Sequence, residues 1–163
     1  MGWRSRSLSW VGRCTLINSV VQAIPNYTMS SFKILAKNCD KLDSLTRRFW
    51  WKPKENEGGF IAWKAWEKLC RPKCVGALGF KRTKDVNAAL LAKLAWIVLS
   101  KREIICMDLL KAKYKFSHEW LHKDPPKVAS PSWKAIESAK SLVSKSACYI
   151  IGDGTSVNVW EDP

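Results

Sequence analysis

The chain has 163 residues, 47% of them hydrophobic and 26% charged, which is enough apolar material for one main domain with a buried core. Lys and Arg total 28 against 14 Asp and Glu, a net charge of +14, so a polyanion is the expected partner and a solvated basic surface the alternative. No apolar run reaches the ~20 residues of a membrane-spanning helix, and the N-terminus lacks the apolar core of a secretory signal, which predicts an intracellular protein, nuclear or cytoplasmic, and not a secreted or membrane one.

The first 51 residues predict two helices. Apolar residues recur at helical spacing between Leu16 and Val21, and Pro25 limits the first helix to residues 9–23, because the residue before a proline avoids the helical region. The second helix is expected to start at an Asn38 N-cap. Its predicted apolar face consists of Cys39, Leu42, Leu45 and Phe49.

The middle of the chain predicts a loop at 52–59, a short helix at 63–69 that packs two tryptophans before Pro72, and a turn between Gly76 and Gly79. A long helix then runs from Thr83, its predicted cap, to Leu99. The stripe expected to face the core consists of Val86, Leu90, Leu94 and Ile97.

The last 64 residues predict two further helices and a hairpin. Ser100 and Glu103 have the spacing of a capping box, which starts a helix that turns Ile104, Leu109 and Leu110 inward. Ser130-Pro131 resembles a helix start, with Trp133, Ile136 and Val143 on the apolar face. Residues 147–151 and 156–160 flank a Gly-Asp-Gly-Thr turn. The predicted fold class is therefore mainly α, a helical bundle with a small C-terminal β-hairpin.

Residues 118–122, HEWLH, match the zinc-protease pattern H-E-x-x-H. These are the only two histidines of the chain, so a third zinc ligand would have to be a carboxylate such as Glu137 or Asp153. The segment also lies next to Pro125-Pro126, where a rigid helix is least expected. A metalloprotease is therefore the less favoured alternative to an incidental match.

Other patterns give no catalytic, metal or cofactor site. Cys70 and Cys74 stand four residues apart without a second Cys or His pair, and the six cysteines are expected to be reduced. The sequence contains no G-x-S-x-G, no G-x-x-x-x-G-K and no G-x-G-x-x-G. Two-metal chemistry needs converging carboxylates, yet no two acids adjoin before Glu161-Asp162. We therefore expect no enzyme activity, no cofactor and no small-molecule substrate.

The run LSWVGRCTLINSVVQAIPNYTMSSFKI at 8–34 resembles the segment downstream of the polymerase core in plant LINE-type (non-LTR) retrotransposon reverse transcriptases. The likeness continues through RRFWW at 47–51, RPKCVGALGFKRTKDVNAALLAKLAW at 71–96, LLKAKY at 109–114 and IIGDGTSVNVWEDP at 150–163. Two departures are Ala77, where the family has the second glycine of G-G-L-G, and Lys52, where glycine is common.

The resemblance implies a region between the polymerase palm and a C-terminal zinc-binding or RNase H part. Residues 1–123 would form a basic helical thumb- or connection-like region, and 124–163 a helix plus hairpin that leads into the C-terminal module. The first range carries a net charge of +15 and the second −1. The implied function is that of a non-catalytic fragment that binds the backbone of RNA or an RNA–DNA duplex; a non-functional remnant of a decayed element is the alternative.

A duplex clamp of this kind requires Lys and Arg on helix faces without base-reading side chains. The candidate phosphate contacts are Arg13, Arg47, Arg48, Lys52, Lys81, Arg82 and Lys84, which avoid the apolar stripes. Trp50 and Trp51 follow Arg47 and Arg48, so they could stack on bases or equally form the buried end of an amphipathic helix. Asn87, part of the family likeness, is more typical of a packing or capping group.

Overall fold

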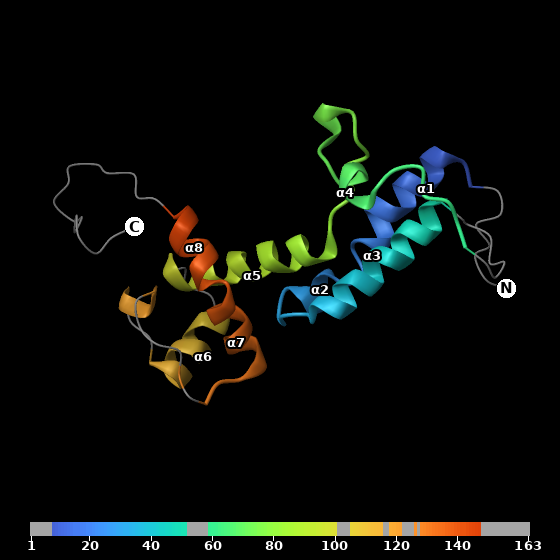
Figure 1. Cartoon of the computed structure of the whole chain (residues 1–163). Helices are drawn as coiled ribbons and strands as arrows, with labels where there is room; N and C mark the ends of the chain where they lie inside the picture. Colours follow the sequence, from blue (N-terminus) through green and yellow to red (C-terminus); the bar gives the residue numbers. More distant parts are fainter. Residues whose placement is uncertain are drawn as a thin grey trace. The chain divides into compact units, whose positions relative to one another are not determined.

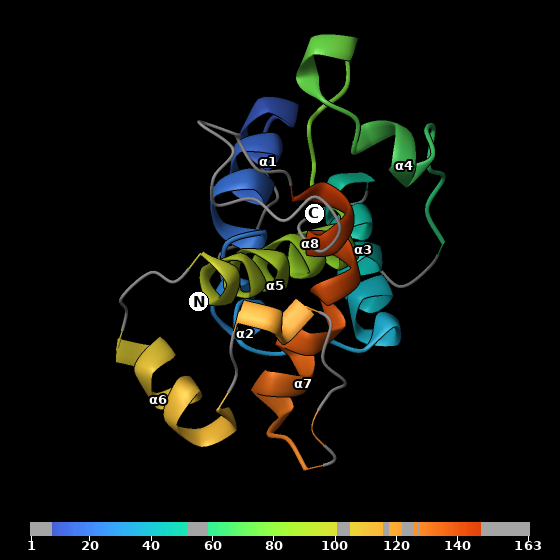
Figure 2. The same cartoon turned by 90° about the vertical axis from the view of Figure 1, so that its left-hand side faces the viewer.

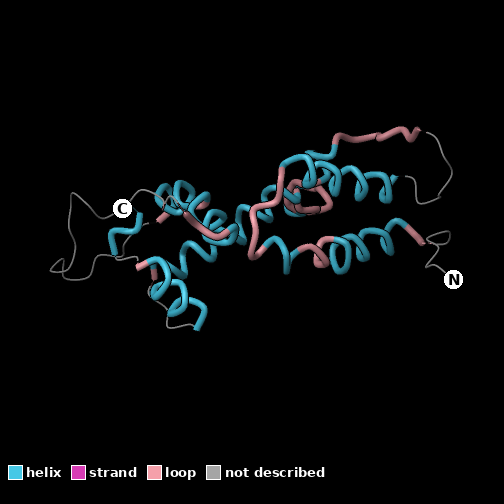
Figure 3. Tube along the Cα trace, turned by 90° about the horizontal axis from the view of Figure 1, so that it is seen from below, coloured by secondary structure: helices cyan, strands magenta, loops and turns pink. Residues whose placement is uncertain are grey.

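A computed structural model of the chain describes residues 8–51, 59–100, 105–115, 118–121, 126 and 128–147. These residues form helices and loops, and none of them lies in a strand (Figure 3). The mainly α prediction is confirmed, whereas the predicted hairpin and the Ser100–Glu103 capping box fall largely outside the described residues. The helices are α1 (Trp10–Leu16), the π-helix η2 (Ile17–Val21), α2 (Asn26–Met29), α3 (Ala36–Trp51), α4 (Trp66–Leu69), the 3-10 helix η3 (Lys73–Val75), α5 (Thr83–Leu99), α6 (Ile105–Tyr114), the 3-10 helix η4 (His118–Leu121), α7 (Pro131–Ser138) and α8 (Lys140–Ser146).

The chain divides into two compact units (Figure 1). The first unit contains residues Met1–Ser30 and Ile34–Ala88, and the second contains Ser31–Lys33 and Ala89–Pro163. The division along the chain falls within α5, so the predicted boundary at residue 123 lies inside the second unit. No helix among the described residues is long and apolar enough to cross a membrane.

The first predicted helix is confirmed as α1 and η2 together. Ser9 caps it, and its hydroxyl oxygen accepts a hydrogen bond from the Gly12 amide at 3.2 Å. The helical stretch ends before Pro25, which the sequence predicted from the missing amide hydrogen and the restriction on Ile24.

The second predicted helix exists as α3, with Cys39 buried and Phe49 packed against the core as predicted, but its start and half of its predicted apolar face were wrong. It begins at Ala36, so Asn38 lies inside it and is not the N-cap. Leu42 and Leu45 are 37% and 55% exposed. The buried residues of α3 are Cys39, Thr46 and Trp50. Thr46 can occupy that face because its hydroxyl donates to the Leu42 carbonyl at 2.9 Å, which satisfies the polar group that burial removes from water.

The core of the first unit is built largely from aromatic rings. Its buried residues are Ile17, Trp50, Trp66, Leu69 and Phe80. The Phe80 ring lies edge-on to Trp50 at 5.3 Å and stacks on Trp66 at 5.5 Å between centroids. Only one of the two tryptophans expected to pack in the 63–69 helix does so, because that helix begins at Trp66 and leaves Trp63 83% exposed.

The Gly76–Gly79 turn is confirmed, with φ angles of +77° and +69°. Both values lie in the left-handed region that glycine adopts without a steric penalty. Ala77 has no such angle, since among the described residues only Lys115 combines a side chain with positive φ. The departure of Ala77 from the G-G-L-G pattern of the reverse transcriptases that the sequence resembles therefore requires no strained backbone.

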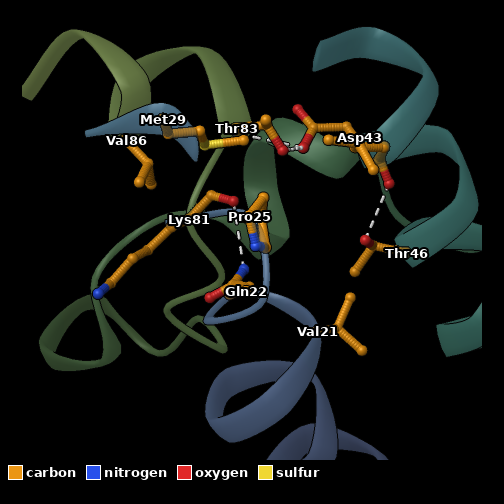
Figure 4. A pocket seen from close by; sticks show the side chains of 10 residues that line it. Val21, Gln22, Pro25, Met29, Asp43, Thr46, Lys81, Thr83 and Val86 are labelled. Atoms are coloured by element: carbon orange, nitrogen blue, oxygen red, sulfur yellow. Dashed lines mark hydrogen bonds between the residues drawn. The ribbon is translucent and has the colours of Figure 1, made fainter. Parts of the chain in front are cut away.

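Helix α5 has the predicted limits, Thr83 and Leu99, but a different capping group and a rotated buried face. The Thr83 amide and hydroxyl both donate to Asp43 Oδ1, at 3.1 and 2.6 Å, so the first turn is capped by a side chain from α3 (Figure 4). Its buried residues are Asn87, Leu91, Ala95 and Val98, one position after each member of the predicted stripe, whose residues are half-buried.

A buried asparagine explains the rotation. The Asn87 side-chain amide donates to the Met29 carbonyl at 2.8 Å, and its oxygen accepts from the Ile34 amide at 3.0 Å. Because these bonds satisfy both ends of the amide, a polar residue occupies the most buried position of the first two turns. The packing role considered for Asn87 is confirmed.

Helices α6, α7 and α8 belong to the second unit (Figure 2), whose core of helical stripes surrounds Trp120 and Trp133. Ser130 caps α7, as predicted, by accepting from the Trp133 amide at 3.3 Å, with Pro131 at the first helical position. The Trp133 ring is 1% exposed and stacks on Tyr114 at 4.5 Å. The predicted apolar face is confirmed, although the helix is divided at Ala139 into α7 and α8.

Helix α6 is present, but one of its predicted inward residues was wrong. Leu109 is 68% exposed, whereas Leu110 packs against the core of the second unit. Ile104 lies outside the described residues. At the end of α6, the Tyr114 phenol donates to the Ser130 hydroxyl at 2.9 Å and accepts from the Ser130 amide at 3.0 Å, and these hydrogen bonds lower the pKa of Tyr114.

Candidate nucleic-acid interface

Most of the excess positive charge belongs to the first unit. It contains 16 Lys and Arg against 6 Asp and Glu, a net charge of +10, whereas the second unit contains 12 against 8, a net charge of +4. A surface that attracts a polyanion is therefore best sought on the first unit.

Helix α3 carries a row of cations on the face opposite its buried one. Lys37, Lys41 and Arg48 are four and seven residues apart, so they share one face of a 3.6-residue helix. All three are exposed, and so is Ser44, which lies between them. We call Lys37, Lys41 and Arg48 the α3 stripe; at 1.5 Å per residue it extends about 16 Å along the helix.

Three of the predicted contacts lie at the start of α5. Lys81, Arg82 and Lys84 are exposed. The backbone carbonyl of Lys81 accepts from Gln22 Nε2 at 3.2 Å, and its ammonium group forms no ion pair with a described residue. Arg82 Nε lies 3.9 Å from Asp85 Oδ2, a contact between two exposed side chains that contributes little to stability and competes weakly with a phosphate.

Arg13 is placed where a phosphate contact is not expected. Its side chain is 9% exposed, and Nη1 donates to the Trp50 carbonyl at 2.8 Å. The guanidinium also lies 4.0 Å from the centre of the Trp10 ring, a cation–π contact. Arg13 therefore joins α1 to the end of α3, and we leave it out of the proposed interface.

Arg47 is less accessible to a phosphate than the α3 stripe. Arg47 is half-buried and its guanidinium faces the Phe60 ring at 5.9 Å. It also lines a hollow of about 220 Å³ that contains three carboxylates. Lys52 lies outside the described residues.

A larger hollow in the first unit combines cations with aromatic rings. Its volume is about 490 Å³. The lining residues are Trp50, Trp51, Lys64, Lys68, Leu69, Arg71, Val75, Gly76, Ala77 and Leu78; we call it the basic–aromatic hollow. By contrast, the cavity in Figure 4, which is lined by the middle of α3, the start of α5 and residues between Val21 and Met29, is about 30 Å³, room for little more than a water molecule.

Sequence reasoning found only part of this surface. It did not select Lys37 and Lys41, although their spacing from Arg48 could have revealed a common helical face. It also did not select Lys64, Lys68 and Arg71, because no motif joins them; α4 and the turn that follows bring them to one hollow.

The zinc alternative remains a prediction, with one observation against it. The side chains of His118 and Glu119, and His122 entirely, lie outside the described residues. Glu137, a suggested third ligand, instead accepts from Trp120 Nε1 at 2.7 Å and pairs with Lys140 Nζ at 2.9 Å. Within the part of the chain that the structure describes, no three His, Cys, Asp or Glu side chains are grouped to hold a metal.

Two curated plant proteins are similar to the chain over most of its length. One is the "Uncharacterized mitochondrial protein AtMg00310" of Arabidopsis thaliana, which is 34% identical over 141 residues, 86% of this chain and 91% of that protein. The chain belongs to the family of this mitochondrial protein. The other is the "Putative ribonuclease H protein At1g65750" of Arabidopsis thaliana, 31% identical over 99% of this chain. The chain spans only 26% of that protein's length.

These relatives support a retrotransposon-related family for the chain, which agrees with the resemblance of its sequence to retrotransposon proteins. No protein-family model matches the chain, and no solved structure matches it.

Proposed function

We propose that the chain is a non-catalytic segment of a LINE-type reverse transcriptase that binds the sugar-phosphate backbone of RNA or an RNA–DNA duplex without reading its sequence. The observation that carries the proposal is the α3 stripe on a unit with a net charge of +10. Lys and Arg on an exposed helix face contact phosphates, and they carry no information about base identity.

The helix geometry supports a backbone contact. Asp40 and Asp43 lie to one side of the α3 stripe, where they line the 220 Å³ hollow, so the row itself is free of carboxylates. A nucleic-acid duplex presents roughly one charge per 1.7 Å of its axis, so a row about 16 Å long can meet several phosphates. Lys81 and Lys84 supply two further exposed cations on the same unit, beside Arg82, whose charge the carboxylates of the 220 Å³ hollow partly offset.

The test is a titration of fluorescently labelled RNA–DNA duplexes of two unrelated sequences with the full chain. We expect equal affinity for both sequences and a steep loss of affinity between about 50 and 300 mM salt, because binding releases condensed counterions. Binding that does not depend on salt, or no binding at low salt, would contradict the proposal.

A matched pair of triple variants locates the contact. In the Lys37→Gln, Lys41→Gln, Arg48→Gln variant we expect the slope of log affinity against log salt to fall by roughly 2 to 3, close to one for each phosphate that the variant no longer neutralises. The control, Lys93→Gln, Lys134→Gln, Lys145→Gln, removes the same charge from exposed positions of the second unit. Equal slopes in the two variants would mean that binding follows net charge and not the α3 stripe.

The alternative of a non-functional remnant makes a different prediction. Both units contain side chains that are at most a few per cent exposed, such as Phe80 and Trp133, which supports a packed protein. A folded chain should unfold cooperatively when followed by circular dichroism. A broad transition together with dye binding would favour the remnant.

A further inference from the structure

The basic–aromatic hollow has the size and lining of a small-ligand site. Its 490 Å³ falls within the range of roughly 300–1,000 Å³ typical of such sites. The hollow opens beside α4 and the turn that carries Gly76, where an added Cβ would meet nothing within 4 Å. A ligand can therefore approach the backbone of this turn closely.

The charges that line the hollow have one sign. Lys64, Lys68 and Arg71 are exposed, and none of the described residues that line the hollow is acidic. None of the three cations forms an ion pair with a described residue, so each retains its charge for a ligand. The neighbouring 220 Å³ hollow differs, because Asp40, Asp43 and Glu67 offset its two arginines. Of these two hollows, the larger one is suited to an anion.

Two indole rings give the hollow a fixed apolar wall. Trp50 is 6% exposed and Trp51 is half-buried. The Trp51 ring is held edge-on by Trp10, at 6.0 Å and 73°, and by Trp50, at 6.2 Å and 70°. A ring that is already held in place loses little entropy when a flat ligand packs against it. Nucleobases stack on such rings whatever their identity.

We propose that the basic–aromatic hollow binds one unstacked nucleotide, with its base against Trp51 and its phosphate among Lys64, Lys68 and Arg71. The site takes a phosphorylated nucleotide whether it is free or at the 5′ end of a single strand. This proposed site deepens the proposed function and rests on it. The α3 stripe binds the backbone of a duplex, whereas the hollow binds a nucleotide outside the duplex.

The test uses the full chain and four probes: adenosine 5′-monophosphate, adenosine, and a short single-stranded RNA with either a 5′-phosphate or a 5′-hydroxyl. Binding is followed by the NMR signal of the Trp51 indole N–H, assigned by its loss in Trp51→Phe. We expect both phosphorylated probes to shift this signal and to bind about tenfold or more tightly than their unphosphorylated counterparts, because each charge-assisted contact favours the phosphate. Stronger binding of the RNA than of the mononucleotide would identify a strand end as the source.

The variant Lys64→Gln, Lys68→Gln, Arg71→Gln replaces three exposed side chains and leaves the aromatic core untouched. It should remove the preference for phosphate and keep the affinity for duplex within about twofold, whereas the α3-stripe variant should do the reverse. If duplex binding is normal but neither phosphorylated probe moves the Trp51 signal, the hollow is not a nucleotide site and the proposed function survives. If the mononucleotide binds and duplex does not, the proposed function fails and the site stands.

Discussion

The two units reach a packed core by different means. The first combines short elements, such as the four residues of α4 and the three of η3, with a core of Trp50, Trp66 and Phe80. The core of the second unit consists of helical stripes of smaller side chains that pack around Trp120 and Trp133. A large ring buries about 150–250 Å², so a few rings can hold short segments that a helical stripe could not anchor. The unit with the aromatic core also carries most of the net charge, and three of its exposed cations form the α3 stripe on a 16-residue helix.

The largest effect should come from removing one ring from each core. Phe80 and Trp133 are each 1% exposed. We expect Phe80→Ala and Trp133→Ala to lower the free energy of unfolding by about 3–5 kcal/mol, since each leaves a cavity in a packed interior. Denaturant titration followed by circular dichroism measures the loss.

A third variant tests whether the loss of stability depends on burial of the ring. Trp63→Ala removes an equally large ring that is 83% exposed, so the free energy of unfolding should change by no more than about 0.5 kcal/mol. A loss at Trp63 equal to the loss at Phe80 would show that the first unit does not depend on its aromatic core in the way described.

A smaller effect is expected at the buried amide of the first unit. Asn87→Ala leaves the Met29 carbonyl and the Ile34 amide without their partner, which should lower the free energy of unfolding by about 2–3 kcal/mol. The control is Asn38→Ala, an exposed residue inside α3. It should raise the free energy of unfolding by up to about 0.5 kcal/mol, because alanine is the better helix former. A loss of about 1 kcal/mol at Asn38 would restore it as an N-cap.

These residues also show what could be read from the sequence. Ser130-Pro131 and the limits of α5 were predictable because their signals are local, a capping side chain and a periodic run. The face of α5 was not, since Asn87 looks polar in the sequence and is buried only because Met29 and Ile34 bond to it. The surroundings of Arg13 could not be predicted for the same reason: its partners, Trp50 and Trp10, are apparent only in the fold.

Helices α5 and α7 begin differently, one with a cap from another helix and one with a local cap, and removing either cap should cost about 1–2 kcal/mol. Asp43→Ala removes a charged acceptor for two donors of Thr83, and Ser130→Ala removes the local cap of α7. We expect Asp43→Ala to cost more, because hydrogen bonds to charged groups are the stronger ones. Ser130→Ala should also raise the pKa of Tyr114, measured by phenolate absorbance, because that phenol loses the Ser130 hydroxyl. An unchanged Tyr114 titration would exclude this contact in solution.

The smallest expected effect is a difference in reactivity between two thiols of the first unit, and its measurement requires no change in stability. Burial raises the pKa of the Cys70 thiol to about 11, whereas Cys74 is exposed. At pH 8 a thiol with that pKa is thiolate only about once in a thousand molecules, so iodoacetamide should alkylate Cys74 well before Cys70. Mass spectrometry of the Cys70 and Cys74 peptides measures the order. Equal rates would mean that α4 opens readily.

The cap of α5 has a consequence for the order in which the chain is made. Asp43 precedes Thr83 by 40 residues, so the carboxylate that completes the first turn of α5 leaves the ribosome before the helix that needs it. Once the first turn of α5 has left the ribosome, Asp43 can already cap it if α3 has formed, whereas α7 contains its cap within its own sequence.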